Sequence, residues 1–276
     1  MIPSRLVRQS LLMLCLSLIV ACATTSVTSE YVPEVGQDGK DVTWVPTCQV
    51  LVDKMLDLAK VTPQDRVVDL GSGDGRLVIT AAKRGARAIG IEYNPDMVAL
   101  SKRNAAREGV AGRAQFIHGD IFESDFSQAT VITMFLLESL NLKLRPQMLN
   151  LKAGTRVVSN TFTMGEWAAD QTATVEENDC GTYSTAYLWI VPGKVEGTWK
   201  FPQGELTLKQ NFQTFTGMLK SGGNTVTVTN GKLSGDLVAF SVGDVQYTGR
   251  VSGNTMKGTY ESGGSTLPWS ATMVGK

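Results

Sequence analysis

One short segment, residues 67–83, limits the folds open to this chain more than any other. Two valines precede the glycine-rich run DLGSGDG at residues 69–75, and apolar residues at helical spacing follow it. A buried strand, a tight glycine turn and a helix in direct succession form the first unit of a nucleotide-type α/β fold. The segment therefore predicts a sheet whose first strand ends at the turn.

Helical and strand-like segments alternate along the chain on both sides of this turn. Apolar residues at helical spacing cover residues 49–61, where Pro63 ends the pattern, and a longer helix is expected over residues 95–108. Further strand-like apolar runs cover residues 88–91, 114–118, 130–135, 156–159 and 186–191. The alternation predicts a Rossmann-like, doubly wound α/β domain over residues 44–193. It implies a parallel sheet, helices on both faces and a ligand at the carboxyl ends of the strands.

Acidic residues in and around the glycine turn indicate the kind of ligand. Asp74 lies inside the turn, and Asp69 closes the strand before it. Dinucleotide sites place a pyrophosphate at this helix N-terminus, where two carboxylates would repel it. They suit a ligand that carries positive charge and no phosphate, and S-adenosylmethionine, with its α-ammonium and sulfonium, has both properties. Asp74 and the missing third spaced glycine disfavour a nicotinamide-dependent oxidoreductase.

Two further acids end the next two strands. Glu92 lies 19 residues beyond Gly73, where a carboxylate can accept hydrogen bonds from both hydroxyls of a ribose. Asp120 ends the third strand and is placed to accept a hydrogen bond from the adenine amine. The plainer alternative for each acid is a loop carboxylate or a helix cap. Because four acids gather at strand ends or in the turn, the sequence predicts a site for S-adenosylmethionine.

These residues resemble the class I S-adenosylmethionine-dependent methyltransferases, and the resemblance covers residues 44–193. The motifs that carry it are WVPT at residues 44–47, DLGSGDGR at 69–76, GIEYNP at 90–95, GDIFESD at 119–125, ATVITMFLLESLNLKLRP at 129–146 and GTRVVSNTF at 154–162. Within that class they are similar to a prokaryotic group related to the lysine methyltransferases of the ATP-synthase c-subunit type.

The resemblance implies an enzyme that transfers a methyl group and uses S-adenosylmethionine as its cofactor. The residues expected to bind the cofactor are Thr47, Asp69, Gly71, Gly73, Glu92 and Asp120. Thr47 belongs to residues 45–47, a segment that the resemblance places over the cofactor. Cys48 follows it where the group usually has a proline.

The residues after the fourth strand bear on the methyl acceptor. No Asn-Pro-Pro-Tyr type motif stands there, which disfavours methylation of adenine N6 or of glutamine amides; residues 135–138 are FLLE. Their apolar side chains suit the alkyl stem of an amine such as that of lysine, with Glu138 holding or deprotonating the amine. Alternatively, Phe135 and Leu136 belong to the sheet core and Glu138 caps the next helix. A small molecule or a protein is the expected acceptor, and no catalytic residue or metal site is assigned.

Three ring-bearing residues and two cysteines leave alternatives open. Trp44 and Trp167 are candidates for aromatic residues of a lid, or for packing residues. His118, the single histidine, is interpreted as a packed or adenine-pocket residue rather than a metal ligand. Cys48 and Cys180 could form a disulfide after export, although two separate buried thiols are the favoured interpretation.

The N-terminal residues predict export and a lipid anchor. Arg5 and Arg8 precede the uncharged run LLMLCLSLIVA at residues 11–21. Its 11 residues are too few to span roughly 30 Å of hydrocarbon and match the core of a signal peptide. The run ends in a lipobox-like sequence before Cys22, so residues 1–21 are expected to be cleaved, with Cys22 lipidated and residues 22–43 serving as a tether. Ordinary cleavage after Ala23 is the alternative. The predicted location is the bacterial envelope, facing the periplasm.

Residues 195–276 have a different character. They hold half of the 28 glycines and show short β-type runs separated by turn signals. The runs cover residues 196–201, 205–219, 225–229, 237–242, 245–251, 255–260 and 267–273, and the turn signals include SGGN at 221–224 and Asn230-Gly231. This pattern predicts an antiparallel meander that closes into a small barrel or sandwich, with Trp199 and Trp269 packed together inside it. It contains no catalytic motif.

Overall charge excludes some functions. The chain balances 26 Lys and Arg residues against 26 Asp and Glu residues, which excludes a broadly basic nucleic-acid binder and an acidic disordered chain. No nucleic-acid partner is expected, and contact with the membrane is expected through the lipid anchor. The alternative to an enzyme is a non-catalytic envelope lipoprotein with a nucleoside-binding domain and a β interaction module.

Overall fold

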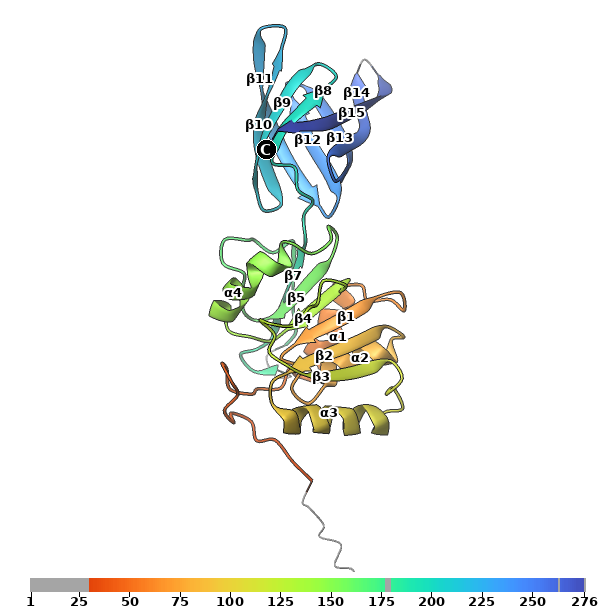
Figure 1. Ribbon diagram of the computed structural model, residues 1–276, viewed down its shortest axis with the longest axis vertical. Helices are drawn as coiled ribbons and strands as arrows, with labels where there is room; N and C mark the ends of the chain where they lie inside the picture. Colours follow the sequence, from red (N-terminus) through yellow and green to blue (C-terminus); the bar gives the residue numbers. More distant parts are fainter. Residues whose placement is uncertain (1–29, 177–179, 263, 276) are drawn as a thin grey trace, which may run out of the picture. The chain divides into compact units, whose positions relative to one another are not determined.

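The computed structural model describes residues 30–176, 180–262 and 264–275, and it contains an α/β domain followed by an all-β domain (Figure 1). The α/β domain comprises α1 (Gln49–Leu58), β1 (Arg66–Leu70), α2 (Arg76–Lys83), β2 (Arg87–Glu92), α3 (Pro95–Arg107), β3 (Ala114–His118), β4 (Val131–Met134), α4 (Glu138–Met148), β5 (Arg156–Asn160), β6 (Gln171–Thr174) and β7 (Thr185–Ile190). The all-β domain comprises β8 (Gly197–Phe201), β9 (Gly204–Asn211), β10 (Thr214–Ser221), β11 (Asn224–Ser234), β12 (Leu237–Val242), β13 (Val245–Ser252), β14 (Thr255–Ser262) and β15 (Ser265–Gly275). The predicted fold class is confirmed.

The predicted signal peptide and the lipidation site Cys22 lie outside the described residues. Within the described ranges, no helix is both long enough and apolar enough to cross a membrane.

A seven-stranded sheet in the order β3-β2-β1-β4-β5-β7-β6 forms the centre of the α/β domain. Neighbouring strands from β3 to β5 run parallel, whereas β7 runs antiparallel to both β5 and β6. The chain winds outward from β1 to β3 and then returns to β4 beside β1, so the strand order reverses between β1 and β4. Open α/β sheets bind their ligands at such a point.

The prediction of a parallel sheet holds for five of the seven strands. Residues 175–184 connect β6 to β7, and a connection this short joins antiparallel neighbours because a parallel pair needs a crossover of a dozen or more residues. The reversed direction of β7 places its first residue at the same edge of the sheet as the last residues of β4 and β5.

The sheet separates two hydrophobic cores. Successive side chains of a strand point to opposite faces, and Val67 and Val68 of β1 accordingly belong to different cores, as do Val158 and Val157 of β5. Buried residues of α1, α2 and α3 pack against one face, and α4 packs Leu144 against the other. Both faces are therefore covered, which leaves the edge at the carboxyl ends of the strands for a ligand.

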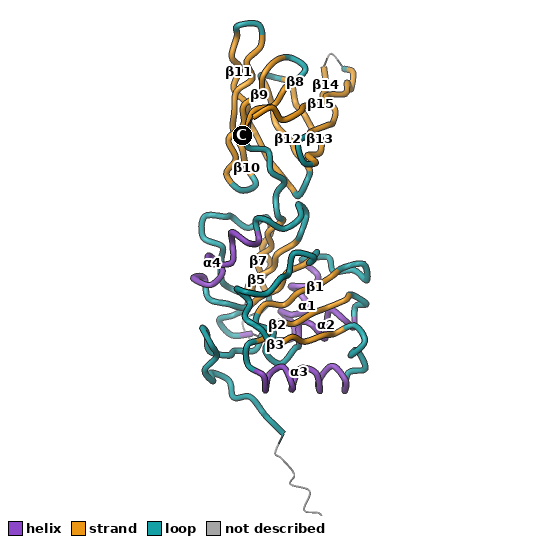
Figure 2. The backbone as a smooth tube through the Cα atoms, viewed as in Figure 1, coloured by secondary structure: helices purple, strands orange, loops and turns teal. Residues whose placement is uncertain are grey.

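The all-β domain is a closed barrel of eight strands, the first of the two architectures predicted for it. Each strand pairs antiparallel with the next, and β15 pairs with β8. Figure 2 shows the strands of this domain joined by short loops. Its buried interior includes the aromatic residues Trp199, Phe201, Phe215, Phe240, Tyr247 and Trp269. The rings of Phe201, Phe240 and Tyr247 lie 5.5, 5.6 and 5.9 Å from that of Trp269, so the interior is a packed core.

Two predicted features of the barrel differ from the structure. Residues 205–219, predicted as one β run, form β9 and β10 with a turn between them, where Phe212 has a φ of 52°. Asn230 and Gly231, predicted as a turn, lie inside β11, where its register with β10 and β12 shifts. An Asn-Gly pair supplies the positive φ that a hairpin turn or a bulge requires, which is why the local sequence does not distinguish them.

Candidate functional site

One pocket lies at the carboxyl ends of the parallel strands, where the strand order reverses. It encloses roughly 980 Å³ of space, its open mouth included. All six residues predicted to bind the cofactor line this pocket, namely Thr47, Asp69, Gly71, Gly73, Glu92 and Asp120. The fold thus gathers the predicted residues at one place, while their contacts with the cofactor stay predictions.

The glycine turn between β1 and α2 forms one wall of the pocket. Gly71, Gly73 and Gly75 have φ values of 77°, 53° and 85°, a left-handed conformation that glycine adopts without steric cost. At Gly73 a side chain is also excluded by a neighbour, because a Cβ there would lie 2.6 Å from Nε1 of Trp44. Trp44 therefore packs directly against the turn, a position that fits both interpretations of this residue, the lid and the packing residue.

Glu92 ends β2 with both carboxylate oxygens bound by backbone amides. The amide of Gly73 donates to Oε2 and the amide of Asn94 donates to Oε1, each at 2.9 Å. These hydrogen bonds fix the carboxylate at the pocket wall, and each oxygen keeps a second lone pair. The arrangement fits the predicted role, in which the two oxygens accept hydrogen bonds from two ribose hydroxyls.

Asp69 is the most deeply buried of the acids that line the pocket. It is 2% exposed, and its Oδ1 accepts a 2.7 Å hydrogen bond from Oγ1 of Thr133. Burial raises the pKa of Asp69 to about 7; the Thr133 hydrogen bond opposes the rise, and the nearby carboxylates of Glu92 and Asp74 add to it. A cation in the pocket would stabilise the ionised form, so this position favours a positively charged ligand.

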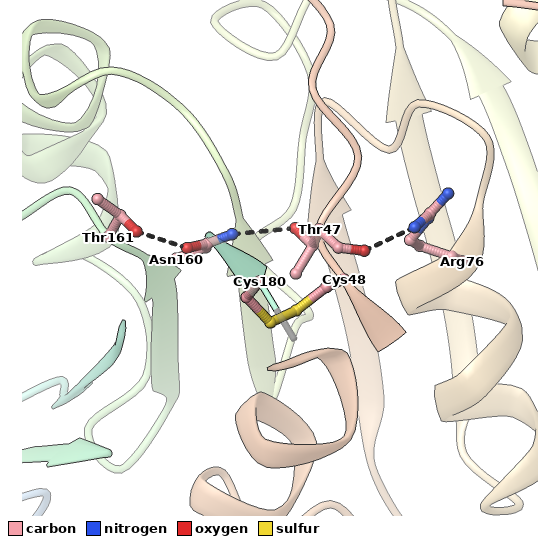
Figure 3. Close-up of a disulfide and its surroundings, with 6 residues drawn as sticks. All are labelled: Thr47, Cys48, Arg76, Asn160, Thr161 and Cys180. Atoms are coloured by element: carbon pink, nitrogen blue, oxygen red, sulfur yellow. Dashed lines mark hydrogen bonds between the residues drawn. A yellow bond between two sulfur atoms is a disulfide. The ribbon is translucent and has the colours of Figure 1, made fainter. Parts of the chain in front are cut away.

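Asp74, the acid inside the glycine turn, is bound by Arg76. Nε and Nη2 of Arg76 donate to the two carboxylate oxygens at 3.0 and 2.6 Å, and the Arg76 amide donates to Oδ1 at 3.2 Å. Asp74 therefore binds the first amide and the first side chain of α2 as a loop carboxylate, while the N-cap residue of this helix is Gly75. Nη1 of Arg76 donates to the carbonyl oxygen of Thr47 at 2.7 Å, and Nδ2 of Asn160 donates to Oγ1 of Thr47 at 3.2 Å (Figure 3).

Asp120 pairs with a basic residue from the segment that precedes α1. Nζ of Lys40 forms an ion pair with Asp120 and lies 4.8 Å from the centre of the Tyr93 ring, while the Phe122 amide donates to Oδ1 of Asp120 at 2.9 Å. The hydrogen bond from Lys40 holds the pKa of Asp120 below its usual value. Residues 37–43 line the pocket, although their sequence predicted a tether. An adenine amine at Asp120 would share this carboxylate with Lys40.

The charges of the pocket fit S-adenosylmethionine. Asp74 and Asp120 form ion pairs with basic side chains, whereas no Lys or Arg in the described part of the chain forms an ion pair with Asp69 or Glu92. A phosphate would meet these two carboxylates without a neutralising cation. A neutral ribose and a cationic amino-acid portion meet no such repulsion.

Three aromatic rings stand at one edge of the sheet and are called the aromatic wall below. Phe135 follows β4 and lines the pocket, Phe162 follows β5, and Tyr183 precedes the antiparallel β7. The ring of Phe135 stacks on that of Phe162, with 6.2 Å between centroids, and meets that of Tyr183 edge-on at 5.1 Å. Asn141, fully buried, donates to the carbonyl oxygens of Phe162 and Thr163, each at 3.1 Å. Of the three rings, that of Phe135 lines the pocket, and the other two pack against it.

Glu138 is the first residue of α4 and lies beside the aromatic wall. Its carboxylate is exposed and accepts a hydrogen bond from the hydroxyl of Thr163, the residue after Phe162. Thr161 has a φ of 61°, a strained conformation for a β-branched residue that is found mainly at functional sites. The segment after β5 is thus held so that it presents one aromatic ring to Phe135 and one hydroxyl to Glu138.

Cys48 and Cys180 form a disulfide, with their Cα atoms 5.4 Å apart. The favoured interpretation of two separate thiols was wrong. The two cysteines are 132 residues apart in the sequence, and only the fold brings the residue before α1 next to the turn before β7. Figure 3 shows the bond next to Thr47, at the base of the segment that covers the pocket.

Three residues of the site are absent from the predicted set. Phe162 lies three residues beyond the predicted strand 156–159, so an extension of the strand-end argument applied after the fourth strand could have found it. Lys40 and Tyr183 lie in segments without periodicity and carry no comparable signal. Two other candidates lie elsewhere, since Trp167 is fully buried in a core of the sheet domain and His118 is exposed outside the pocket.

Comparisons with known proteins agree with this geometry. The model of the ANTKMT methyltransferase domain family matches residues 69–171. A protein-lysine N-methyltransferase of Saccharolobus islandicus (strain REY15A) is 42% identical over 153 residues, which cover 54% of this chain and 94% of that enzyme. The Homo sapiens lysine N-methyltransferase of the ATP-synthase c-subunit is 40% identical over 105 residues, covering 38% of this chain and only 45% of that enzyme.

A solved structure is also similar. The crystal structure of an RNA methyltransferase from Salinibacter ruber in complex with S-adenosyl-L-homocysteine gives a TM-score of 0.51 at 48% identity, and the match covers 55% of this chain and 96% of that one. The ligand in that structure is the demethylated form of S-adenosylmethionine, which agrees with the cofactor that the pocket charges favour.

Replacing Glu92 by alanine is expected to weaken binding of S-adenosylmethionine about tenfold or more, because the acceptors that face the ribose hydroxyls are lost. Binding is measured by isothermal titration calorimetry on the full chain. Glu123→Ala, at an exposed acid outside the pocket, is the matched control and should bind as the unaltered protein does. An unchanged dissociation constant for Glu92→Ala would contradict the ribose role.

The affinity for S-adenosylmethionine is expected to rise with pH between about 5.5 and 7. Because the pKa of Asp69 is raised to about 7, its carboxyl group binds a proton below that pH and must release it to face a cation. The dissociation constant should therefore fall by up to about tenfold per pH unit in this range and level off above it. Asp69→Asn should remove most of this dependence, with His118→Gln as the control for the single imidazole; the same slope in Asp69→Asn would refute the assignment.

Proposed function

This chain belongs to the class I S-adenosylmethionine-dependent methyltransferases, and from that premise we propose that it methylates the side-chain amine of a protein lysine. The observation that carries the proposal is the aromatic wall beside Phe135, with the carboxylate of Glu138 next to it. Aromatic side chains beside a carboxylate match an acceptor side chain with a long alkyl stem and a terminal amine.

The cofactor, when bound, supplies a methyl group activated by the sulfonium to which it is attached. The residues of the chain then have to align the acceptor nitrogen with that methyl group and exclude water. Trp44 and residues 45–47 line the pocket, as does Phe135 of the aromatic wall. These contacts support an in-line displacement in a partly closed site.

Glu138 is proposed to handle the proton of the acceptor. A lysine amine is protonated at neutral pH and has to lose a proton before its lone pair can attack the methyl group. The Glu138 carboxylate is exposed at the start of α4 and held by the Thr163 hydroxyl, so it can attract the ammonium group and accept the proton. The proposed function depends on Glu138 and on the aromatic wall, which is proposed to bind the alkyl stem.

The relatives support lysine as the acceptor more than they support RNA. Two of the relatives described above carry lysine methylation in their names, whereas the Salinibacter ruber protein is described as an RNA methyltransferase. Binding to RNA relies on an excess of positive charge. This chain has none, with 26 basic residues against 26 acidic ones. The protein-lysine N-methyltransferase of Saccharolobus islandicus, matched over 94% of its length, likewise favours an enzyme over a non-catalytic lipoprotein.

The envelope location is the second part of the proposal. The apolar run at residues 11–21 and the cysteine that follows it carry the inference of export and lipidation at Cys22. The Cys48–Cys180 disulfide supports it, because disulfides persist in oxidising compartments such as the periplasm and are rare in the cytosol. The proposed protein is a lipid-anchored methyltransferase that faces the periplasm.

Lysine methylation is tested with the full chain, S-adenosylmethionine labelled in the methyl group, and poly-L-lysine as the acceptor. We expect labelled methyl-lysine after hydrolysis of the product, and no transfer to poly-L-arginine. Glu138→Gln should lower kcat/KM for poly-L-lysine by about tenfold or more while the affinity for S-adenosylmethionine stays unchanged. Glu166→Gln, at another exposed glutamate, is the control. If no methyl-lysine forms with the unaltered protein, lysine is not the acceptor.

Lipidation is tested by expressing the full chain in a bacterial host and labelling with radioactive palmitate. The unaltered chain should take up the label, and Cys22→Ala should not, because the thiol that would carry the lipid is missing. Cys15→Ala, inside the apolar run, is the matched control and should label normally. Label retained in Cys22→Ala would overturn the assignment of the anchor.

A further inference from the structure

The Cys48–Cys180 disulfide joins the two sides of the proposed active site. Cys48 directly follows Thr47, which lines the cofactor pocket, and Cys180 begins the turn that carries Tyr183 of the aromatic wall. One covalent bond, drawn in Figure 3, therefore connects Cys48, next to the segment that covers the cofactor, with Cys180, three residues before Tyr183.

The Cys48 side of the bond is secured by several other interactions. Arg76 donates to the carbonyl oxygen of Thr47 at 2.7 Å, and Asn160 donates to its hydroxyl at 3.2 Å. The amide of Val52 donates to the carbonyl oxygen of Cys48 at 3.0 Å, which begins the hydrogen bonding of α1. Thr47 itself is 5% exposed. This side should keep its position without the disulfide.

Fewer hydrogen bonds among the described residues hold the Cys180 side, although Cys180 packs, with Cys48, against the core that includes residues of α1 and α2. Within the turn, the Tyr183 amide donates to the carbonyl oxygen of Cys180 at 3.4 Å, and at its base the Val175 amide donates to that of Ser184 at 2.9 Å. Gly181 and Thr182 are exposed. In the described part of the chain, no hydrogen bond joins residues 180–183 to an element beyond the flanking strands β6 and β7. The disulfide is thus the covalent link between this turn and the segment that covers the cofactor.

Tyr183 takes its place in the wall from this turn. Its ring is 36% exposed and contacts Phe135 edge-on, at 5.1 Å between centroids and 65° between ring planes. Phe162 approaches Phe135 separately and is held by Asn141. Two rings of the wall are therefore fixed by β4, β5 and α4, whereas the third depends on the turn that Cys180 begins.

We propose that the Cys48–Cys180 disulfide is a positioning element for the methyl acceptor, which holds Tyr183 against Phe135 so that the aromatic wall can receive the alkyl stem. The inference rests on the proposed function, because it takes the aromatic wall as the acceptor surface. Its distinctive consequence is an asymmetry: opening the bond loosens the acceptor side of the site and leaves the cofactor side intact.

The test compares the oxidised full chain with the chain reduced by tris(2-carboxyethyl)phosphine. In that reduction the phosphine supplies two electrons and water supplies one oxygen and two protons, so that the phosphine becomes its oxide and the disulfide becomes two thiols. We expect the KM for poly-L-lysine to rise about three- to tenfold, the range that loss of one aromatic contact produces. The dissociation constant of S-adenosylmethionine should stay within about twofold.

Variants separate positioning from general stabilisation. Tyr183→Ala should raise the KM as reduction does, and reduction should then have no further effect on it, because both changes remove the same contact. Tyr183→Phe keeps the ring and should behave as the unaltered protein does, including its response to reduction. The double variant Cys48→Ser, Cys180→Ser should match the reduced protein and be insensitive to the phosphine. An additive effect of reduction on Tyr183→Ala would overturn the proposal.

A second measurement needs no acceptor. Amide hydrogen exchange of residues 180–185 should become at least about fivefold faster on reduction, while that of residues 44–52 stays unchanged. If the oxidised protein fails to methylate poly-L-lysine, the proposed acceptor is wrong and this measurement alone decides the role of the disulfide. Equal loosening of both segments, no change in either, or a loss of cofactor affinity on reduction would each refute the asymmetry.

Discussion

The guanidinium group of Arg76 joins the parts of the site that the rest of the structure has to hold together. It binds Asp74 inside the glycine turn and the carbonyl oxygen of Thr47 in the covering segment. The hydroxyl oxygen of Thr47 in turn accepts a hydrogen bond from Nδ2 of Asn160. Oδ1 of Asn160 accepts one from the hydroxyl of Thr161. A continuous series of polar contacts therefore runs from the glycine turn to the segment after β5 that carries Phe162 of the aromatic wall.

The distribution of charge in the pocket follows from the same contacts. Arg76 and Lys40 neutralise Asp74 and Asp120, so a ligand meets these acids as parts of ion pairs. Asp69 and Glu92 are held instead by a hydroxyl and by backbone amides, which orient a carboxylate without cancelling its charge. The charges of Asp69 and Glu92 are thus available to a cationic ligand, whereas those of Asp74 and Asp120 are neutralised.

Sequence reasoning reached the parts of the site that depend on neighbours along the chain. The glycines and acids follow predicted strands directly, and parallel strands bring their carboxyl ends to one edge, so Asp69 and Glu92 could be placed together. Lys40, Tyr183 and the cysteine pair depend on contacts between distant segments, which periodicity does not encode. The reversed β7 and the bulge at Asn230 have the same origin, since pairing partners decide both.

The span of the disulfide has a consequence for the unfolded chain. The bond closes a loop of 132 residues that contains β1 to β6, every strand that leads into the cofactor pocket, whereas the barrel lies outside it. In the chain-entropy description, closing a loop of this size lowers the conformational entropy of the unfolded state and raises its free energy by about 5 kcal/mol. That restriction acts on the α/β domain alone, so the two domains of one chain differ in how much order their unfolded segments retain.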